Sequence, residues 1–211
     1  MRSRGISLLR ATLRQEGWRL PGGSPDAIER RVETLALPRA LVTTLAPLRT
    51  WLSELTSLLK AADAAVEDLA TSDPVAQNLM TAPGVGPVVA LTFAAVLDDP
   101  TRFAGDAARA SAFLGLVPSE DSSAERRLKG AITKTGPADL RALLVQASWT
   151  IWRGRSAAGA ELRTWAHALA KRRGRRIAIV ALARRVSRIL FAMWRDQTAF
   201  GVKGQRPIIA A

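Results

Sequence analysis

Apolar residues recur at alternating intervals of four and three over nearly thirty positions in the first half of the chain. The positions are Leu41, Leu45, Leu48, Leu52, Leu55, Leu59, Ala62, Val66 and Leu69. This alternation predicts a long helix with a coiled-coil-like apolar seam. Pro47 is expected to interrupt the helix near its start, because proline disrupts an interior helical turn. The seam fits a helix packed within one chain and a coiled coil between two chains equally well.

Shorter amphipathic stretches on both sides of this seam predict further helices. We expect them over residues 1–17, 24–35, 74–80, 103–114, 137–152, 159–171 and 177–194. The only strand pattern is a short hairpin within residues 115–133. The fold class is therefore mainly α. A helical stalk or coiled-coil region is expected over 1–73, a compact helical domain over 74–200 and a flexible tail over 201–211.

The basic charge of the chain is concentrated in its second half. There are 31 Lys and Arg residues against 18 Asp and Glu residues, for a formal net charge of +13. Residues 1–105 hold 11 of each kind, and residues 106–211 hold 20 basic and 7 acidic residues. This asymmetry predicts one surface that binds a polyanion. We expect nucleic acid and no membrane partner, because no apolar run could span a bilayer and the N-terminus is not a signal peptide. An Arg-rich helix on a membrane surface is the lesser alternative.

Composition excludes several classes of site. The chain has no cysteine, which rules out disulfides, thiol catalysis and thiolate metal sites. Its single histidine, His167, rules out a His-rich zinc site and argues against a Ser-His-Asp triad. We expect His167 to be structural. Asp98 and Asp99 fit a helix boundary or cap better than a metal site, so no metal site is expected.

The sequence APGVGPVVA at residues 82–90 is typical of a helix-hairpin-helix turn. Gly84 and Gly86 would let the turn approach another backbone closely. The N–H groups that begin the next helix could then bind a DNA phosphate without reading the base sequence. The alternative is a plain turn whose glycines serve only the backbone conformation.

Residues 115–136 combine serines with basic residues. Ser119, Ser122 and Ser123 stand near Arg126, Arg127, Lys129 and Lys134. A serine hydroxyl could attack a phosphorus atom while the cations stabilise charge on the non-bridging oxygens. Composition alone favours the alternative, a solvated loop that contacts phosphates.

The C-terminal region is the most basic part of the chain. Residues 171–176 read KRRGRR, and Arg184, Arg185, Arg188 and Arg195 follow on one expected helix. Such a cationic face predicts salt-dependent nucleic-acid binding. Trp149, Trp152, Trp165 and Trp194 are expected to be core or interface anchors rather than platforms for base stacking.

The run GLVPSEDSSAERRLKGAITKTGPADLRALLVQASW resembles the signature of the insertion-sequence-110/116/902 family of transposases. In that family a G-L-x-P segment is followed by a serine pair, a basic stretch, G-x-I-[ST]-K-x-G and a helical L-R-x-L-L. The preceding PGVGPVVALTFAAVLDDPTRF resembles the family's helix-hairpin-helix entry, and the helix over 41–69 resembles its coiled coil. The similarity covers nearly the whole chain.

The resemblance implies DNA cleavage and rejoining at a serine that forms a covalent phosphoserine link, guided by a structured RNA. The matching serine is Ser123, with Ser122 as the second choice. Ala124 stands where the family usually has glycine, which predicts a stiffer loop. The residues assigned to DNA binding are Gly84, Gly86, Arg126, Arg127, Lys129, Lys134 and Arg141. Family Mg²⁺ belongs to an N-terminal RNase-H-like domain that this chain lacks, so no cofactor is expected here.

Three functions remain open at this point. The first is a serine transposase, expected in the bacterial cytoplasm at the nucleoid and self-associating through the helix over 41–70. It would be an N-terminally shortened form arising from a mis-set start, a frameshift or a natural short form. The second is a non-catalytic DNA- or RNA-binding remnant of a transposase. The third is an oligomerisation module whose basic face is incidental.

Overall fold

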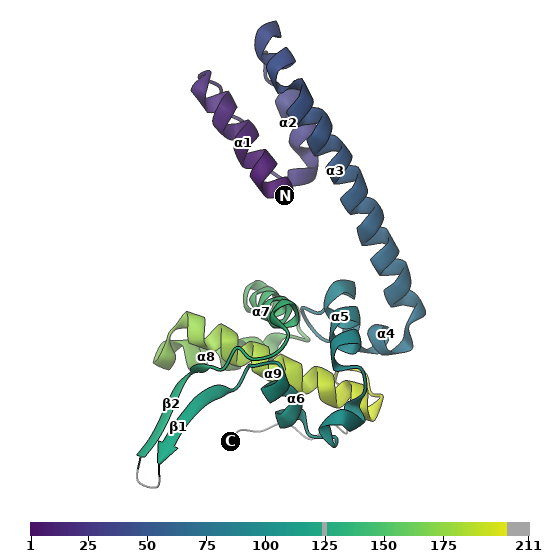
Figure 1. The fold of residues 1–211 in the computed structure, drawn as a ribbon, viewed down its shortest axis with the longest axis vertical. Helices are drawn as coiled ribbons and strands as arrows, with labels where there is room; N and C mark the ends of the chain where they lie inside the picture. The colour runs from purple at the N-terminus through teal and green to yellow at the C-terminus, as the bar shows by residue number, and fades with distance from the viewer. Residues whose placement is uncertain (124–125, 202–211) are drawn as a thin grey trace. The chain divides into compact units, whose positions relative to one another are not determined.

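The computed structural model describes residues 1–123 and 126–201, and it describes the backbone alone for residues 121–123 and 126–129. The predicted tail lies outside the described residues apart from Gly201. The chain divides into two compact units, which we call the N-terminal unit, Met1–Ala65, and the C-terminal unit, Val66–Ala211 (Figure 1).

Helices alone build the N-terminal unit. Its elements are α1 (Arg2–Gln15), η1 (Pro25–Ala27), α2 (Ile28–Glu33) and most of α3 (Arg39–Ser72). One face of each α-helix enters a small core made of Ile6, Leu9, Leu13, Ile28, Val32, Leu41, Leu45 and Leu52. The 3.6-residue spacing of these apolar positions is what predicted helices here, and that prediction is confirmed.

Helix α3 runs from Arg39 to Ser72 without a break, so the interruption predicted at Pro47 is wrong. Proline removes one backbone N–H and crowds the preceding turn. Burial of Leu45 and Leu52 in the core on either side of Pro47 offsets that local cost.

The apolar seam of α3 is covered only over its first half. No residue from Ser53 to Leu69 is buried, and Leu58, Leu59 and Leu69 are 68%, 37% and 60% exposed. We call Leu55, Leu59, Ala62, Val66 and Leu69 the open seam. Large apolar side chains left in water are an energetic cost that a partner surface can remove.

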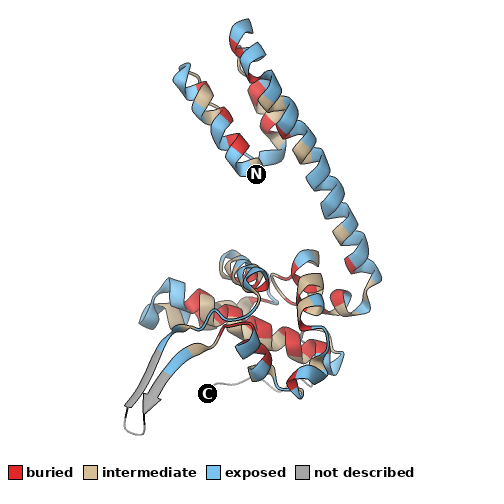
Figure 2. Cartoon of the chain, in the orientation of Figure 1, coloured by how far each residue is buried: buried red, intermediate tan, exposed pale blue. Residues whose placement is uncertain are grey.

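The C-terminal unit is built around one long central helix. Its helices are α4 (Pro74–Met80), α5 (Pro87–Leu97), η2 (Pro100–Phe103), α6 (Ala107–Phe113), α7 (Ala138–Arg153), α8 (Ala160–Arg173) and α9 (Arg175–Asp196). Helix α9 packs against α4, α6, α7, α8 and η2, and its buried residues run along most of its length (Figure 2). The fold is mainly α, as predicted.

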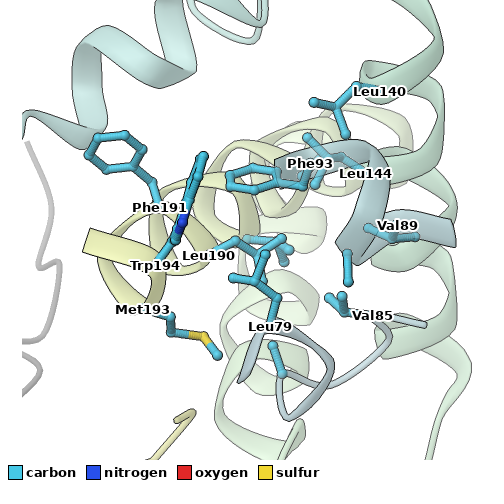
Figure 3. Close-up of a cluster of buried hydrophobic side chains, with 14 of the residues drawn as sticks. Leu79, Val85, Val89, Phe93, Leu140, Leu144, Leu190, Phe191, Met193 and Trp194 are labelled. Atoms are coloured by element: carbon cyan, nitrogen blue, oxygen red, sulfur yellow. The ribbon is translucent and has the colours of Figure 1, made fainter. Parts of the chain in front are cut away.

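Aromatic and aliphatic side chains fill the core beside α9 (Figure 3). The Phe93 ring meets the Trp194 ring edge-on with centroids 6.4 Å apart. Phe191 meets Phe103 in the same way at 5.8 Å. Such edge-to-face pairs add to the stabilisation from burial. Among the described helices none is long and apolar enough to cross a membrane.

Aspartates determine where three of these helices begin. The carboxylates of Asp73, Asp99 and Asp106 accept hydrogen bonds from backbone N–H groups in the first turns of α4, η2 and α6. Asp73 and Asp99 each precede a proline, a residue that suits the first helical position. These three aspartates thus serve local structure.

Candidate nucleic-acid interface

A two-stranded antiparallel hairpin interrupts the helices of the C-terminal unit. Strand β1 covers Pro118–Ser123 and strand β2 covers Arg126–Ile132. The register pairs Ser123 with Arg126 and Ser122 with Arg127. The hairpin expected within 115–133 is therefore present, and it places the predicted serines directly across from predicted DNA-binding arginines.

A bulge near the base of the hairpin uses the hydroxyl of the remaining serine. The register shifts between Pro118 and Glu120, so that Gly130 and Ala131 lie opposite Ser119. The Ser119 hydroxyl donates to the Ala131 carbonyl oxygen at 3.0 Å. A Cβ at Gly130 would lie 2.5 Å from that hydroxyl, so a larger residue there would displace it. Ser119 is thereby part of the fold of the hairpin.

Tight backbone packing fixes the base of the hairpin to the helical core. Gly115 and Gly136 have positive φ angles of 65° and 77°. A Cβ on Gly115 would collide with Thr135, and one on Gly136 with the Phe113 carbonyl. The Thr133 N–H donates to the Val117 carbonyl oxygen at 2.9 Å. Only glycine tolerates both this conformation and this closeness.

Arg141, predicted to bind DNA, holds the base of the hairpin in place. Its Nη1 donates to the Leu114 carbonyl oxygen at 3.0 Å and to the Thr135 carbonyl oxygen at 3.1 Å. The side chain is half-buried. Lys134, by contrast, is exposed beside the hairpin and adopts a left-handed backbone conformation with φ 57°. Arg141 therefore positions the hairpin, whereas the exposed side chain of Lys134 can contact a phosphate.

The side chains of the remaining predicted residues lie outside the described part of the chain. These are Ser122, Ser123, Arg126, Arg127 and Lys129, whose backbone alone is described. Ala124 belongs to the two residues that are not described at all. The serine assignment therefore depends on the backbone register of the two strands, which pairs these serines with Arg126 and Arg127.

The turn between α4 and α5 uses its two glycines differently. Gly84 has φ 76°, and a Cβ there would lie 2.6 Å from the Ala147 carbonyl oxygen of α7. Its close approach is therefore to the protein's own backbone. Gly86 caps α5, and a Cβ there would meet nothing within 4 Å. The N–H groups of Val88 and Val89 follow at the start of α5, where a helix leaves its first donors without intrahelical partners.

Acidic residues do not gather into a cation site among the described residues. Asp99 accepts from the Thr101 N–H at 2.7 Å, and this backbone hydrogen bond lowers its pKa below the usual 3.8. Asp98 ends α5 with φ 67° and lies 4.0 Å from Arg102. Both occupy the helix boundary that the sequence predicted. The Mg²⁺ that the resemblance implies therefore has no fitting residues in this part of the chain.

The basic residues of α8 and α9 differ in availability. The exposed ones are Lys171, Arg172, Arg173, Arg175, Arg176 and Arg195. Arg185 lies 3.7 Å from Glu161 and stacks over the Trp165 ring at 4.8 Å. Arg195 pairs with Asp196 at 2.7 Å and also donates to the Gly105 carbonyl oxygen. The cationic face predicted along the whole region is thus concentrated at the turn between the two helices.

Two half-buried arginines stand out within α9. Burial lowers the pKa of Arg184, and the nearby charge of Arg188 adds to that effect. The Nε atoms of both side chains are buried without a hydrogen-bond partner in the described structure.

The four tryptophans of the C-terminal unit occupy two kinds of environment. Trp194 is a core residue, as predicted. Trp149 and Trp152 lie half-buried at the end of α7, and His167 is exposed. Sequence periodicity could not separate them, because a helix face at the edge of a core shows the same spacing as one inside it.

The family that the chain matches is recognised within the C-terminal unit. Residues 76–163 match the transposase IS116/IS110/IS902 family. That range contains the turn between α4 and α5, the hairpin and α7. A probable family 20 transposase of Pseudomonas aeruginosa is 28% identical over 168 residues, covering 80% of this chain and 49% of that protein.

Two further relatives are transposases of named insertion sequences. The transposase for insertion sequence element IS1111A of Coxiella burnetii is 33% identical over 124 residues, covering 59% of this chain and 34% of that protein. The transposase for insertion sequence element IS1328 of Yersinia enterocolitica is 26% identical over 203 residues, covering 94% of this chain and 60% of that protein. The chain spans between about a third and three fifths of these relatives.

The helical core that carries the basic, serine-containing hairpin is thus the part of the chain that is similar to these transposases. The match to the IS116/IS110/IS902 transposase family over residues 76–163 agrees with the resemblance seen in the sequence.

Proposed function

We propose that this chain acts in DNA transposition and that Ser123 is its nucleophile. The observation that carries the assignment is the register of the hairpin, which sets Ser123 opposite Arg126 and Ser122 opposite Arg127. Ser119 is less suited, because its hydroxyl is engaged within the hairpin. The rigid base holds both strands at a defined position on the helical core.

The proposed step is a transesterification. The Ser123 oxygen forms a bond to a DNA phosphorus, the bond from that phosphorus to one deoxyribose oxygen breaks, and the released hydroxyl takes up the serine proton. Arg126, Arg127, Lys129 and Lys134 stabilise charge on the non-bridging oxygens. Attack by a hydroxyl of a second strand reverses the step and rejoins DNA. We derive no step through Mg²⁺, since no fitting cation site exists among the described residues.

The test is a search for a covalent protein–DNA product. The chain is mixed with labelled DNA and with the N-terminal RNase-H-like domain of a family member. The products are then separated under denaturing conditions. We expect a covalent product with the native chain and with Ser119→Ala, but none with Ser123→Ala. A product that survives in both Ser122→Ala and Ser123→Ala contradicts the assignment.

The alternative function is nucleic-acid binding without catalysis. Ala124 in place of the family glycine favours it. This alternative predicts salt-dependent DNA binding with no covalent product under any of these conditions.

The open seam suggests a second copy of the chain as a partner. A continuous apolar stripe at coiled-coil spacing is complementary to itself, so two α3 helices can cover each other. A guide RNA and association with the bacterial nucleoid are parts of the same proposal, and both rest on the family resemblance.

A further inference from the structure

Two tryptophans at the end of α7 form an aromatic surface at the edge of the C-terminal unit's core, against which Trp152 packs. Trp149 and Trp152 lie with ring centroids 6.4 Å apart and ring planes at 74°. Both are half-buried. Trp194 shows what a core tryptophan looks like in this fold, since it is buried and packs against Phe93. Trp149 and Trp152 leave part of their rings available to another molecule.

A histidine from a second helix extends this surface. The His167 ring of α8 stacks on the Trp152 ring with centroids 3.9 Å apart and planes tilted by 33°. His167 is exposed, whereas its neighbour Ala166 points into the core. The imidazole therefore continues the aromatic surface outward from the protein. We call Trp149, Trp152 and His167 the aromatic platform.

Two cationic side chains lie over the Trp149 ring of the platform. The Arg153 and Arg175 guanidinium carbons lie 4.9 Å and 5.8 Å from the Trp149 ring centroid. An open hollow of about 580 Å³ adjoins this ring, lined by Gln146, Trp149, Thr150, Arg153 and Gly154. Arg175 itself belongs to the exposed stretch from Lys171 to Arg176.

Acidic residues are scarce around this surface. Residues 138–196 contain 13 Lys and Arg residues against Asp139, Glu161 and Asp196. Asp196 is paired with Arg195, and Glu161 lies next to Arg185. The positive charge near the platform is therefore mostly uncompensated, which suits a polyanion with flat, stackable groups.

We propose that the aromatic platform binds unpaired nucleotides of a DNA single strand. Bases would stack on the tryptophan and histidine rings, while Arg153, Arg175 and residues 171–176 contact the phosphates. Single-strand binding elsewhere combines these two features, because every base has a stackable face and the backbone is anionic. A duplex hides the base faces and would use the cations alone. The choice of DNA rests on the proposed function, since strand cleavage releases unpaired DNA ends.

The test compares single-stranded with duplex DNA on the full chain. Affinity is measured by fluorescence anisotropy for a labelled thymidine strand of about 12 nucleotides and for a duplex of the same length. The double variant Trp149→Leu/Trp152→Leu should weaken single-strand binding by about tenfold or more. Duplex binding should change by less than about twofold. The matched control is Trp165→Leu, which removes a half-buried tryptophan under Arg185 instead.

A second variant separates stacking from folding. Trp149→Phe/Trp152→Phe keeps flat rings and should restore most of the single-strand affinity, whereas Trp149→Leu/Trp152→Leu should not. Unchanged single-strand binding in the leucine variant overturns the proposal, and so does an equal loss for single strand and duplex. A clear preference for a uridine RNA strand would replace DNA as the ligand. Binding to anionic phospholipid vesicles that depends on the same tryptophans would assign the surface to a membrane.

The outcome is distinguishable from that of the proposed function. Ser123→Ala should leave single-strand affinity unchanged, because the platform lies on α7 and α8 and the serine on β1. Loss of the covalent product with intact single-strand binding bears on the serine alone. Intact covalent chemistry without tryptophan-dependent binding overturns the platform alone.

Discussion

The guanidinium of Arg141 donates to the carbonyl oxygen of Leu114 at 3.0 Å, across 27 positions of the chain. The same nitrogen also donates to Thr135. One side chain on α7 thus joins the segment that enters the hairpin to the segment that leaves it. The hairpin is held at its base by a group that the sequence predicted to bind DNA.

Arg141→Ala should destabilise the C-terminal unit and impair DNA rejoining more than DNA binding. It leaves two carbonyl groups without their charged donor, a loss of about 1–3 kcal/mol in the free energy of unfolding. Chemical denaturation measures this loss, and Arg155→Ala, at an exposed position of the following loop, is the control. Equal stability of the two variants would contradict the role given to Arg141.

Gly84→Ala and Gly86→Ala should differ sharply although they lie two residues apart. Alanine at position 84 must adopt φ 76° and approach the Ala147 carbonyl oxygen to 2.6 Å. We expect a loss of more than about 2 kcal/mol in the free energy of unfolding. Alanine at position 86 meets nothing within 4 Å and should leave stability nearly unchanged. Thermal denaturation compares them, and weaker duplex binding by Gly86→Ala would support a DNA-contacting turn.

Leu59→Glu should abolish self-association of the chain. A charge placed within the open seam cannot be buried without a large desolvation penalty. Ser57→Glu adds the same charge on the opposite side of the helix and serves as the control. Sedimentation equilibrium measures the mass of each variant. A native chain that stays monomeric at high concentration argues against pairing through α3.

Asp99→Asn should flatten the acid dependence of stability. The pKa of Asp99 is lowered by the Thr101 N–H, so its carboxylate is favoured by folding. The contribution of this cap is fully present above the usual pKa of 3.8. It is lost as the pH falls through the lower folded pKa. Melting temperatures recorded at falling pH should therefore drop less steeply in the variant than in the native chain.

Arg172→Gln/Arg173→Gln should reduce the salt dependence of duplex binding. Each lost phosphate contact lowers the slope of log affinity against log salt by about 0.9, so the pair should lower it by roughly 2. Arg195→Gln should leave the slope unchanged, since Arg195 is engaged by Asp196 and Gly105. Titrations at several salt concentrations give both slopes. If the two variants show the same slope of log affinity against log salt, the phosphates do not contact Arg172 and Arg173.

The helices were largely predictable from local sequence. Helix α4 begins at Pro74 after the cap Asp73, and it ends at Met80 as expected. The period of apolar residues also predicted α7, α8 and α9, with their ends placed to within a few residues. Pro47 was misjudged because local propensity counts the missing N–H but not the burial of Leu45 and Leu52, which depends on tertiary packing.

The candidate site was predictable only in outline. The serines and arginines could be named from the motif, but the pairing of Ser123 with Arg126 depends on the hairpin register. Arg141 and Gly84 were predicted to bind DNA, and no local pattern revealed how closely they approach Leu114 and Ala147. The stacking of His167 on Trp152 is a contact between two helices, so the sequence pattern of neither helix could predict it.

The open seam would make the proposed pairing of two α3 helices depend on how much protein is present. Two copies associate in one equilibrium, so at low concentration the amount of paired protein rises with the square of the total concentration. A cell that makes few copies would hold them mostly apart, and a modest rise in expression would produce a disproportionate rise in paired protein.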